Sequence, residues 1–194
     1  MSVKLQLFKI FSLNSIATII RVVFNLLLIK TMAFKLGTTG MAYFGQLTSL
    51  LSIVSIVSTA GITNGIVKYT AEFKKNKKLL LQYINSANRI SIVVSLINSI
   101  LLIVFSSIIS DNLFGNAKYF WVIISFGLIL LFYVLSTIVI AILNGFGEYT
   151  KVIKINVFYI IISNSFSILS IFLWGLEGAL FSIAISQFFQ FTVA

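Results

Sequence analysis

The chain has 194 residues, of which 59% are hydrophobic and only 9% are charged, and its mean hydropathy is +1.11. A soluble domain of this size could not hide so much apolar surface, so the composition predicts a polytopic membrane protein. The formal net charge is +10, but the basic residues stand in short segments between apolar runs, which argues against nucleic acid as a partner. The absence of Cys and His from the sequence excludes disulfides, Cys/His metal sites and thiol or imidazole catalysis.

Six apolar runs are long enough, or nearly so, to cross a bilayer core as helices, which takes about 20 residues each. They cover 10–34, 43–67, 84–109, 119–143, 155–174 and 179–194. Helices are expected because an isolated strand in lipid leaves its backbone groups unpaired. We therefore predict an all-α fold with six transmembrane helices, forming a single transmembrane domain over 1–194.

The first run carries a polar stripe. At 100° per residue, Asn14, Thr18, Arg21 and Asn25 fall within about 60° of one another on one helix face. Arg21 stands near mid-span, where a charge costs about 2.5–3.5 kcal/mol to insert, so we expect it to face a water-filled cavity. The alternatives are that Arg21 snorkels to the interface or pairs with a carboxylate on another helix. Lys30 lies near the far end of its run, where snorkelling is an equal alternative to a place in the cavity.

Later runs carry weaker polar stripes. The second holds Gln46, Ser49, Ser52, Ser55, Thr59 and Thr63; the third holds Asn88, Ser91, Ser95 and Asn98; the fifth holds Asn156, Ser163, Ser167 and Ser170. Serines inside a membrane usually serve helix packing and hydrogen bonds between helices, and we favour that interpretation for these serines. Gln46, Asn88 and Asn98 have larger amide groups and are predicted to line the cavity together with the stripe of the first run.

The connections between the runs set the orientation. Gly37 and Gly40 mark a turn after the first run, and five lysines follow the second. With the N-terminus in the cytoplasm, the basic residues on that side are Lys4, Lys9, Lys68, Lys74, Lys75, Lys77, Lys78, Arg89, Lys151 and Lys154, against Lys30, Lys35 and Lys118 outside. Because cytoplasmic loops are enriched in Lys and Arg, this asymmetry predicts a cytoplasmic N-terminus. Anionic membrane lipids are expected partners of the basic segment.

The residue types inside the spans point to transport. A cavity with cations and no acids favours an anionic group such as phosphate or pyrophosphate. The sequence shows no paired carboxylates, glycine-rich phosphate loop or catalytic triad, so we expect no enzyme, no catalytic residue, no metal site and no cofactor.

Several stretches carry a family resemblance: GITNGIVKY at 61–69, Gln46, LFGN at 113–116, GLEGALFSIAIS at 175–186, and the charges Arg21 and Lys30. In these the chain resembles the O-antigen flippases of the Wzx type, which share a superfamily with lipid II flippases and MATE multidrug exporters. The resemblance implies a flippase of undecaprenyl-pyrophosphate-linked O-antigen or polysaccharide repeat units in the bacterial inner membrane, working by alternating access between two six-helix lobes. The chain would be the N-terminal lobe, with a C-terminal lobe and polysaccharide-assembly proteins as partners.

Other functions are weighed against this one. A MATE-like exporter of drugs or cations would need an acidic residue inside a span, and the sequence places none in the six runs. A membrane enzyme of polysaccharide synthesis, such as a polymerase, would need catalytic groups in a long outward loop, and the predicted outward loops are short. A purely structural subunit would leave Arg21 unexplained.

Overall fold

The structure is a computed structural model that describes residues 3–59 and 61–194, with side chains described from Phe8 onwards except those of Lys9 and Ala60. Lys4 and Lys9, two of the basic residues assigned to the cytoplasmic side, therefore have side chains outside the described part. In chain order the elements are α1 (Val3–Ser58), α2 (Thr63–Glu72), η1 (Phe73–Lys75), α3 (Lys77–Val104), α4 (Ser106–Phe114), η2 (Ala117–Tyr119), α5 (Phe120–Phe146) and α6 (Tyr149–Val193). The described residues are helical without any strand, which confirms the all-α prediction.

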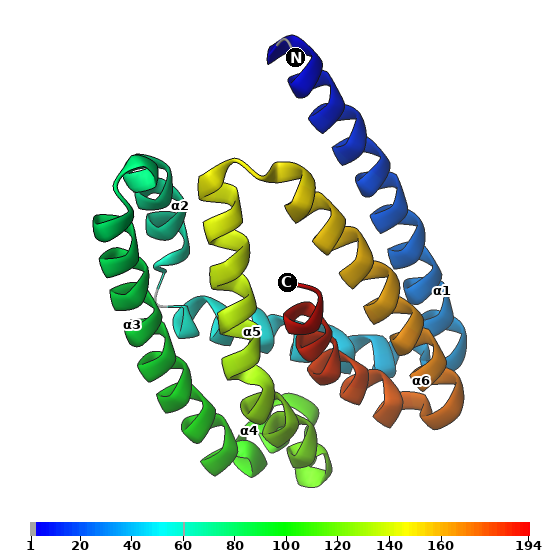
Figure 1. The fold of residues 1–194 in the computed structure, drawn as a ribbon. Helices are drawn as coiled ribbons and strands as arrows, with labels where there is room; N and C mark the ends of the chain where they lie inside the picture. Colours follow the sequence, from blue (N-terminus) through cyan, green and yellow to red (C-terminus); the bar gives the residue numbers. More distant parts are fainter. Residues whose placement is uncertain (1–2, 60) are drawn as a thin grey trace.

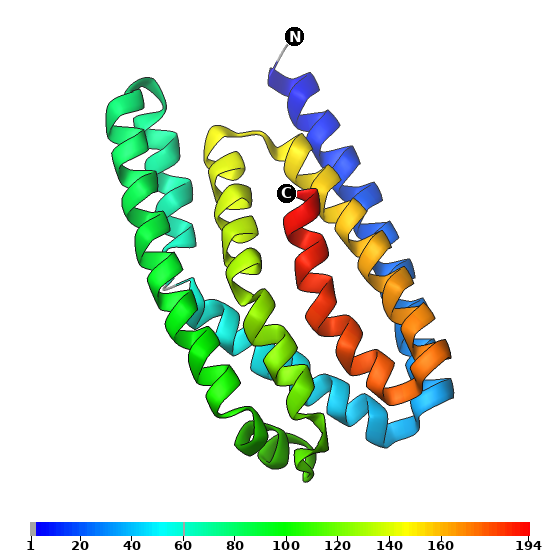
Figure 2. The same cartoon turned by 60° about the horizontal axis from the view of Figure 1, so that its bottom comes forward.

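The number of continuous helices differs from the six that were predicted. In the described part, four helices are long and apolar enough to cross a membrane, and two of these measure 49 and 45 residues. Each of the two contains a kink, at Gly37 in α1 and at Gly175 in α6, where φ is 65° and 57°. Glycine adopts this conformation without the penalty that a side chain imposes, so two helices can meet there with hardly any loop. Figures 1 and 2 show the sharp change of direction within both α1 and α6.

Two predicted boundaries also move. The second run is interrupted near Gly61, whose φ is 64°, and its last part forms the separate helix α2. The third helix begins at Lys77 rather than at residue 84, because the Asn76 side chain accepts a hydrogen bond from the Leu79 amide and caps α3. In addition, the residues just after the third predicted run, 110–114, belong to the helix α4. These helical turns at the ends of the spans were not predicted, because the sequence bounds were drawn from polarity alone.

The two ends of the bundle differ in charge. The N-terminus, the α2–α3 turn and the α5–α6 turn lie at one end, whereas α4 and the bends of α1 and α6 lie at the other (Figures 1 and 2). The end with the α2–α3 turn therefore collects Lys74, Lys75, Lys77 and Lys78. The predicted topology requires these loops to share one side of the membrane, and the fold is compatible with it. That this side is the cytoplasm remains a prediction.

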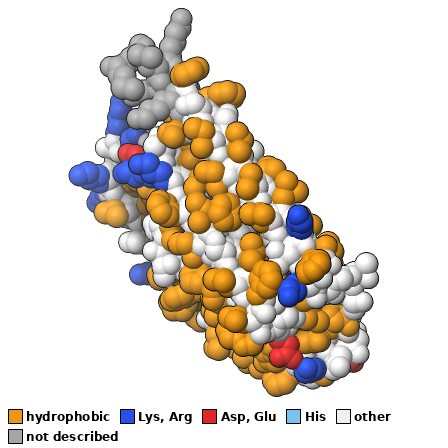
Figure 3. Space-filling view, turned by 90° about the vertical axis from the view of Figure 1, so that its right-hand side faces the viewer, with side chains coloured by type: hydrophobic (Ala, Val, Ile, Leu, Met, Phe, Trp, Pro, Cys, Tyr) orange, Lys and Arg blue, Asp and Glu red, His pale blue; other side chains and the backbone are white. Residues whose placement is uncertain are grey.

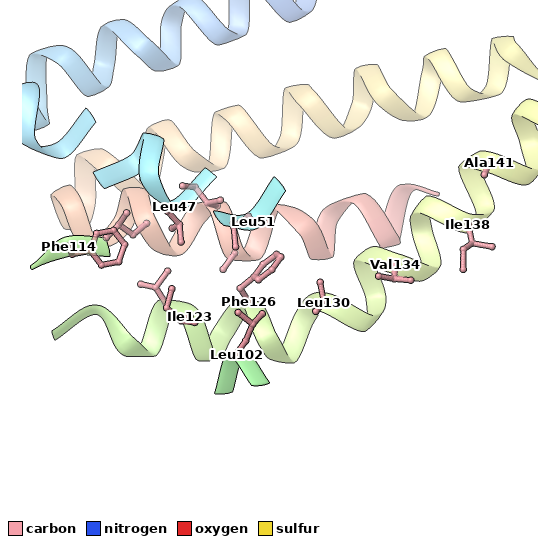
Figure 4. Close-up of a cluster of buried hydrophobic side chains, with 14 of the residues drawn as sticks. Leu47, Leu51, Leu102, Phe114, Ile123, Phe126, Leu130, Val134, Ile138 and Ala141 are labelled. Carbon is pink, nitrogen blue, oxygen red and sulfur yellow. The ribbon is translucent and has the colours of Figure 1, made fainter. Parts of the chain in front are cut away.

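The core is organised around α5 (Figure 4). Ile123, Phe126, Leu130 and Val134 of this helix are fully buried. They form one cluster with side chains from other helices, among them Leu47 and Leu51 of α1, Leu102 of α3, Phe114 of α4 and Leu180 of α6. A second, smaller cluster joins the first half of α1 to α6 through Leu28, Met32, Ile171 and Ala179. The helix α5 is thus the central helix of the core.

The outer surface is apolar. Phe34 is 84% exposed and Leu173 is 69% exposed, and many other large hydrophobic side chains are exposed as well. Figure 3 shows one face on which hydrophobic side chains dominate, with basic side chains gathered at its upper left and standing singly elsewhere. Such a surface would drive aggregation in water, but it suits contact with lipid chains. The arrangement agrees with a multi-pass membrane protein.

Candidate substrate-binding site

The polar stripe of the first run follows the contact between α1 and α6. At one level the Asn164 side chain of α6 donates a hydrogen bond of 3.0 Å to the Asn25 side-chain oxygen of α1. The Thr18 hydroxyl donates to the Asn14 carbonyl at 2.8 Å, within α1. Asn14 itself lines a cavity together with residues of α6. The structure therefore places Asn14 and Asn25 beside the same helix, α6.

Arg21 is exposed and lies near the middle of the first half of α1. The Gly37 kink is 16 positions further along, roughly 24 Å at 1.5 Å per residue, so the Arg21 side chain cannot snorkel to that end of the bundle. The two ion pairs among the described residues are Lys118–Glu177 at 2.7 Å and Lys151–Glu148 at 3.6 Å. Arg21 joins neither pair. Its guanidinium is therefore open to an anionic ligand.

A cavity of about 580 Å³ lies beside the N-terminal part of this stripe. Its polar lining consists of Asn14 from α1, Asn144 from α5, and Tyr149 and Asn156 from α6, while Ile10 and Phe11 contribute apolar surface. The volume falls in the range of small-molecule sites, about 300–1,000 Å³. Amide groups can both donate and accept hydrogen bonds, so this lining suits a neutral polar group.

Two further cavities adjoin one another inside the bundle, with volumes of about 360 and 170 Å³. Both are lined by Thr48 of α1 and by Ile183 and Gln187 of α6. The smaller one is also lined by Asn164, the partner of Asn25. The hydrogen bond between Asn25 and Asn164 therefore connects the polar stripe of α1 to the lining of the smaller of these cavities.

The remaining predicted residues lie elsewhere. Lys30 and Gln46 are exposed, and neither lines the three cavities described above. Asn88 and Asn98 belong to α3, which Figures 1 and 2 place at the opposite edge of the bundle from the first half of α1. Asn98 donates to the Val94 carbonyl of its own helix at 3.0 Å, and the Asn88 side-chain oxygen is buried without a hydrogen-bond partner. The structure does not bring these four residues together with Arg21, and their role in binding stays a prediction.

Several cavity residues were not selected from the sequence. They are Asn144, Tyr149, Tyr159, Asn164 and Gln187. The rule that singled out Asn88 and Asn98, a large amide group in an apolar run, applies equally to Asn164 and Gln187 and could have found them. Nothing in the sequence marks Tyr149 and Tyr159, because aromatic residues are common both in spans and at interfaces.

Fold and site together define a multi-pass α-helical membrane protein with an unpaired arginine in its first span and uncharged polar cavities between its helices. The chain is 23% identical over 173 residues to the Lipid III flippase of Escherichia coli (strain K12), and equally to that of Shigella flexneri. Each match covers 87% of this chain and 41% of the relative, so the chain spans less than half the length of these curated relatives. No family model and no solved structure matches it. Both relatives are transporters rather than enzymes, which agrees with the expectation that the chain is not an enzyme.

Proposed function

We propose that the protein moves a lipid-linked oligosaccharide precursor across the bacterial inner membrane by alternating access, and that this chain is one six-helix lobe of it. The observation that carries the proposal is the similarity to Lipid III flippases over 87% of the chain. The arginine in the first span supports it independently, because a charge at that depth is tolerated when it faces water or a ligand.

The substrate class follows from the charge of the site. An undecaprenyl-linked sugar carries a pyrophosphate, and Arg21 offers this group a planar fork of N–H donors. Asn14, Thr18 and Asn25 lie on the same face and would add uncharged hydrogen bonds. Lys30 stands nine positions further along α1 and on its opposite face, so a role of Lys30 in binding the same group stays a prediction. Cationic substrates are disfavoured because Glu72, Asp111 and Glu148 belong to turns or to the ends of helices, while Glu177 follows the kink of α6 and pairs with Lys118.

The repeat unit is the finer part of the proposal. The resemblance at GITNGIVKY and GLEGALFSIAIS favours O-antigen or polysaccharide repeat units, whereas the curated relatives are named for lipid III. The complete protein should be expressed in a strain that lacks its O-antigen flippase and, separately, in one that lacks its Lipid III flippase. Restored surface polysaccharide in the first strain supports O-antigen, and relief of precursor accumulation in the second supports lipid III. Failure in both strains, with normal membrane abundance, would contradict the proposal.

The orientation belongs to the same proposal. Lys75 in η1 and Asp111 in α4 are both exposed and belong to opposite ends of the bundle. Because the chain lacks cysteine, single Lys75→Cys and Asp111→Cys variants can be treated with an impermeant thiol reagent in spheroplasts. We expect Asp111→Cys to be labelled and Lys75→Cys to be labelled only after permeabilisation. The opposite labelling pattern would contradict the predicted orientation of the protein in the membrane.

A further inference from the structure

The two cavities of about 360 and 170 Å³ share the lining residues Thr48, Ile183 and Gln187, and together we call them the polar chamber. The second half of α1, α5 and both halves of α6 contribute to its walls. The other polar residues that line it are Ser52, Ser55, Tyr133, Tyr159, Ser163, Asn164, Ser167 and Ser186. Every one of these lining side chains is uncharged. The chamber therefore differs in chemistry from the face of α1 that carries Arg21.

Hydrogen bonding makes the chamber rich in acceptors. The hydroxyl groups of Thr48, Ser52 and Ser55 donate to backbone carbonyls of their own helix at 2.9, 2.8 and 2.6 Å. Ser186 donates in the same way to the Ile183 carbonyl at 2.7 Å. Since each proton is engaged by the backbone, what these oxygens have left for a ligand is their lone pairs. A ligand that bonds to these oxygens must bring donors, while the hydroxyls of Tyr133 and Tyr159 can still donate to it.

Gln187 gives the strongest sign of such a ligand. Its side-chain oxygen is buried and has no hydrogen-bond partner in the described part of the protein. A buried acceptor without a partner carries a desolvation penalty, so a donor is expected at this position. A phosphate offers almost only acceptors and cannot supply a donor to the Gln187 oxygen. A sugar offers several hydroxyl donors.

The position of the chamber also fits a sugar. Asn164 lines its smaller part and is hydrogen-bonded to Asn25, which follows Arg21 by four residues, or about 6 Å along the helix. The first sugar of a lipid-linked oligosaccharide is joined directly to the pyrophosphate, so both groups have to be bound side by side. The larger cavity, of about 360 Å³, reaches the size of a small-ligand site.

We propose that the polar chamber binds an uncharged, hydroxyl-rich sugar of the translocated lipid, while the Arg21 face of α1 binds its phosphates. This inference rests on the proposed function and divides its site into two parts of different chemistry. The sugar part is centred on Gln187 and Thr48, neither of which the sequence singled out.

The test uses the complete protein in lipid nanodiscs and two probes, undecaprenyl pyrophosphate and undecaprenyl-pyrophosphate-linked N-acetylglucosamine. Gln187→Leu keeps much of the side-chain volume but removes the acceptor. We expect it to weaken binding of the sugar-bearing probe about two- to tenfold, the effect of one hydrogen bond, and to leave binding of the sugar-free probe unchanged. Thr48→Val, which removes only a hydroxyl, should give a smaller loss in the same direction.

Thr137→Val is the matched control, because the Thr137 hydroxyl donates to the Tyr133 carbonyl at 3.0 Å but lines neither part of the chamber. It should bind both probes as the unmodified protein does. Equal affinity of the unmodified protein for both probes would overturn the inference, as would unchanged or equally weakened binding of both probes by folded Gln187→Leu. Arg21→Gln is expected to weaken both probes alike. Arg21→Gln could leave the binding of both probes unchanged while Gln187→Leu weakens only the sugar-bearing probe. That result would contradict the phosphate-binding role of Arg21 in the proposed function and would support the sugar-binding role of the chamber.

Discussion

The two sides of the bundle are built differently. On one side α5 packs closely against α2 and α3: a side chain on Gly145 would meet Thr70 at 2.5 Å, and one on Gly127 would meet Ile103 at 3.0 Å. On the other side, the first half of α1 meets α6 through a small apolar cluster and an exposed pair of amides, Asn25 and Asn164. Arg21 belongs to this second side, and the three cavities described above all have residues of α6 in their walls.

This difference assigns stability of the fold to one side of the bundle and transport to the other. Helices in lipid gain little from the hydrophobic effect between them, so close contact at small residues and a few hydrogen bonds hold them together. The α2–α3–α5 side has such contacts and serves as the scaffold. The α1–α6 contact is also extensive, but it includes amide side chains and borders the cavities, which leaves polar groups available to a substrate. Substitutions should therefore affect stability on the first side and binding on the second.

The largest effect on stability is expected from Gly145→Ala. The new methyl group would lie 2.5 Å from the Thr70 β-carbon and 2.8 Å from the Val67 carbonyl, so α2 and α5 have to move apart. Overpacking of this kind costs about 1–3 kcal/mol. Thermal unfolding of the purified protein in detergent measures it. Gly45→Ala is the control, because its methyl group meets nothing within 4 Å and alanine favours a helix. Equal unfolding temperatures for both variants would show that the α2–α5 contact is not tight.

A smaller loss is expected from Ser99→Ala. The Ser99 hydroxyl of α3 donates to the Gly127 carbonyl of α5 at 2.6 Å, a hydrogen bond between two helices. Such bonds in membranes contribute about 0.6 kcal/mol on average and up to about 1.7 kcal/mol. Ser86→Ala removes a hydroxyl that bonds only to Gln82 of its own helix and should change the unfolding free energy less. A larger effect of Ser86→Ala would contradict the account.

The smallest effect on stability is expected from Asn164→Leu on the α1–α6 side. The Asn25–Asn164 pair is exposed, so its loss should change the unfolding free energy by about 0.5 kcal/mol or less. Transport by the complete protein should nevertheless fall, because Asn164 lies between the Arg21 face and the polar chamber. A clear drop in unfolding temperature with normal transport would assign this pair to the scaffold instead.

Much of the fold could be predicted because lipid leaves the backbone few choices. The apolar runs predicted the helices, and Gly37 marked the turn that follows the first run. The break near Gly61 was missed, because apolar residues continue on both sides of it. The cap at Asn76 was missed because basic residues surround it and hide the start of α3.

The candidate site was only partly predictable. Helical periodicity places Asn14, Thr18, Arg21 and Asn25 on one face, since that depends on a single helix. Which helix this face meets depends on tertiary packing, so only the structure places Asn164 beside Asn25. For the same reason Asn88 and Asn98, which also share one helix face, could not be placed at the far edge of the bundle from the sequence.

The central claim is that Arg21 binds the anionic group of the substrate. The most direct measurement compares Arg21→Gln with Arg89→Gln in the complete protein, following precursor translocation and membrane abundance together. Arg89 is also exposed, but it belongs to α3 on the scaffold side. We expect Arg21→Gln to lower translocation at least about tenfold, since a charge-assisted contact is worth about 1.5–3 kcal/mol, with unchanged abundance, and Arg89→Gln to behave as the unmodified protein. Normal translocation by Arg21→Gln, or an equal loss in both variants, would contradict the account.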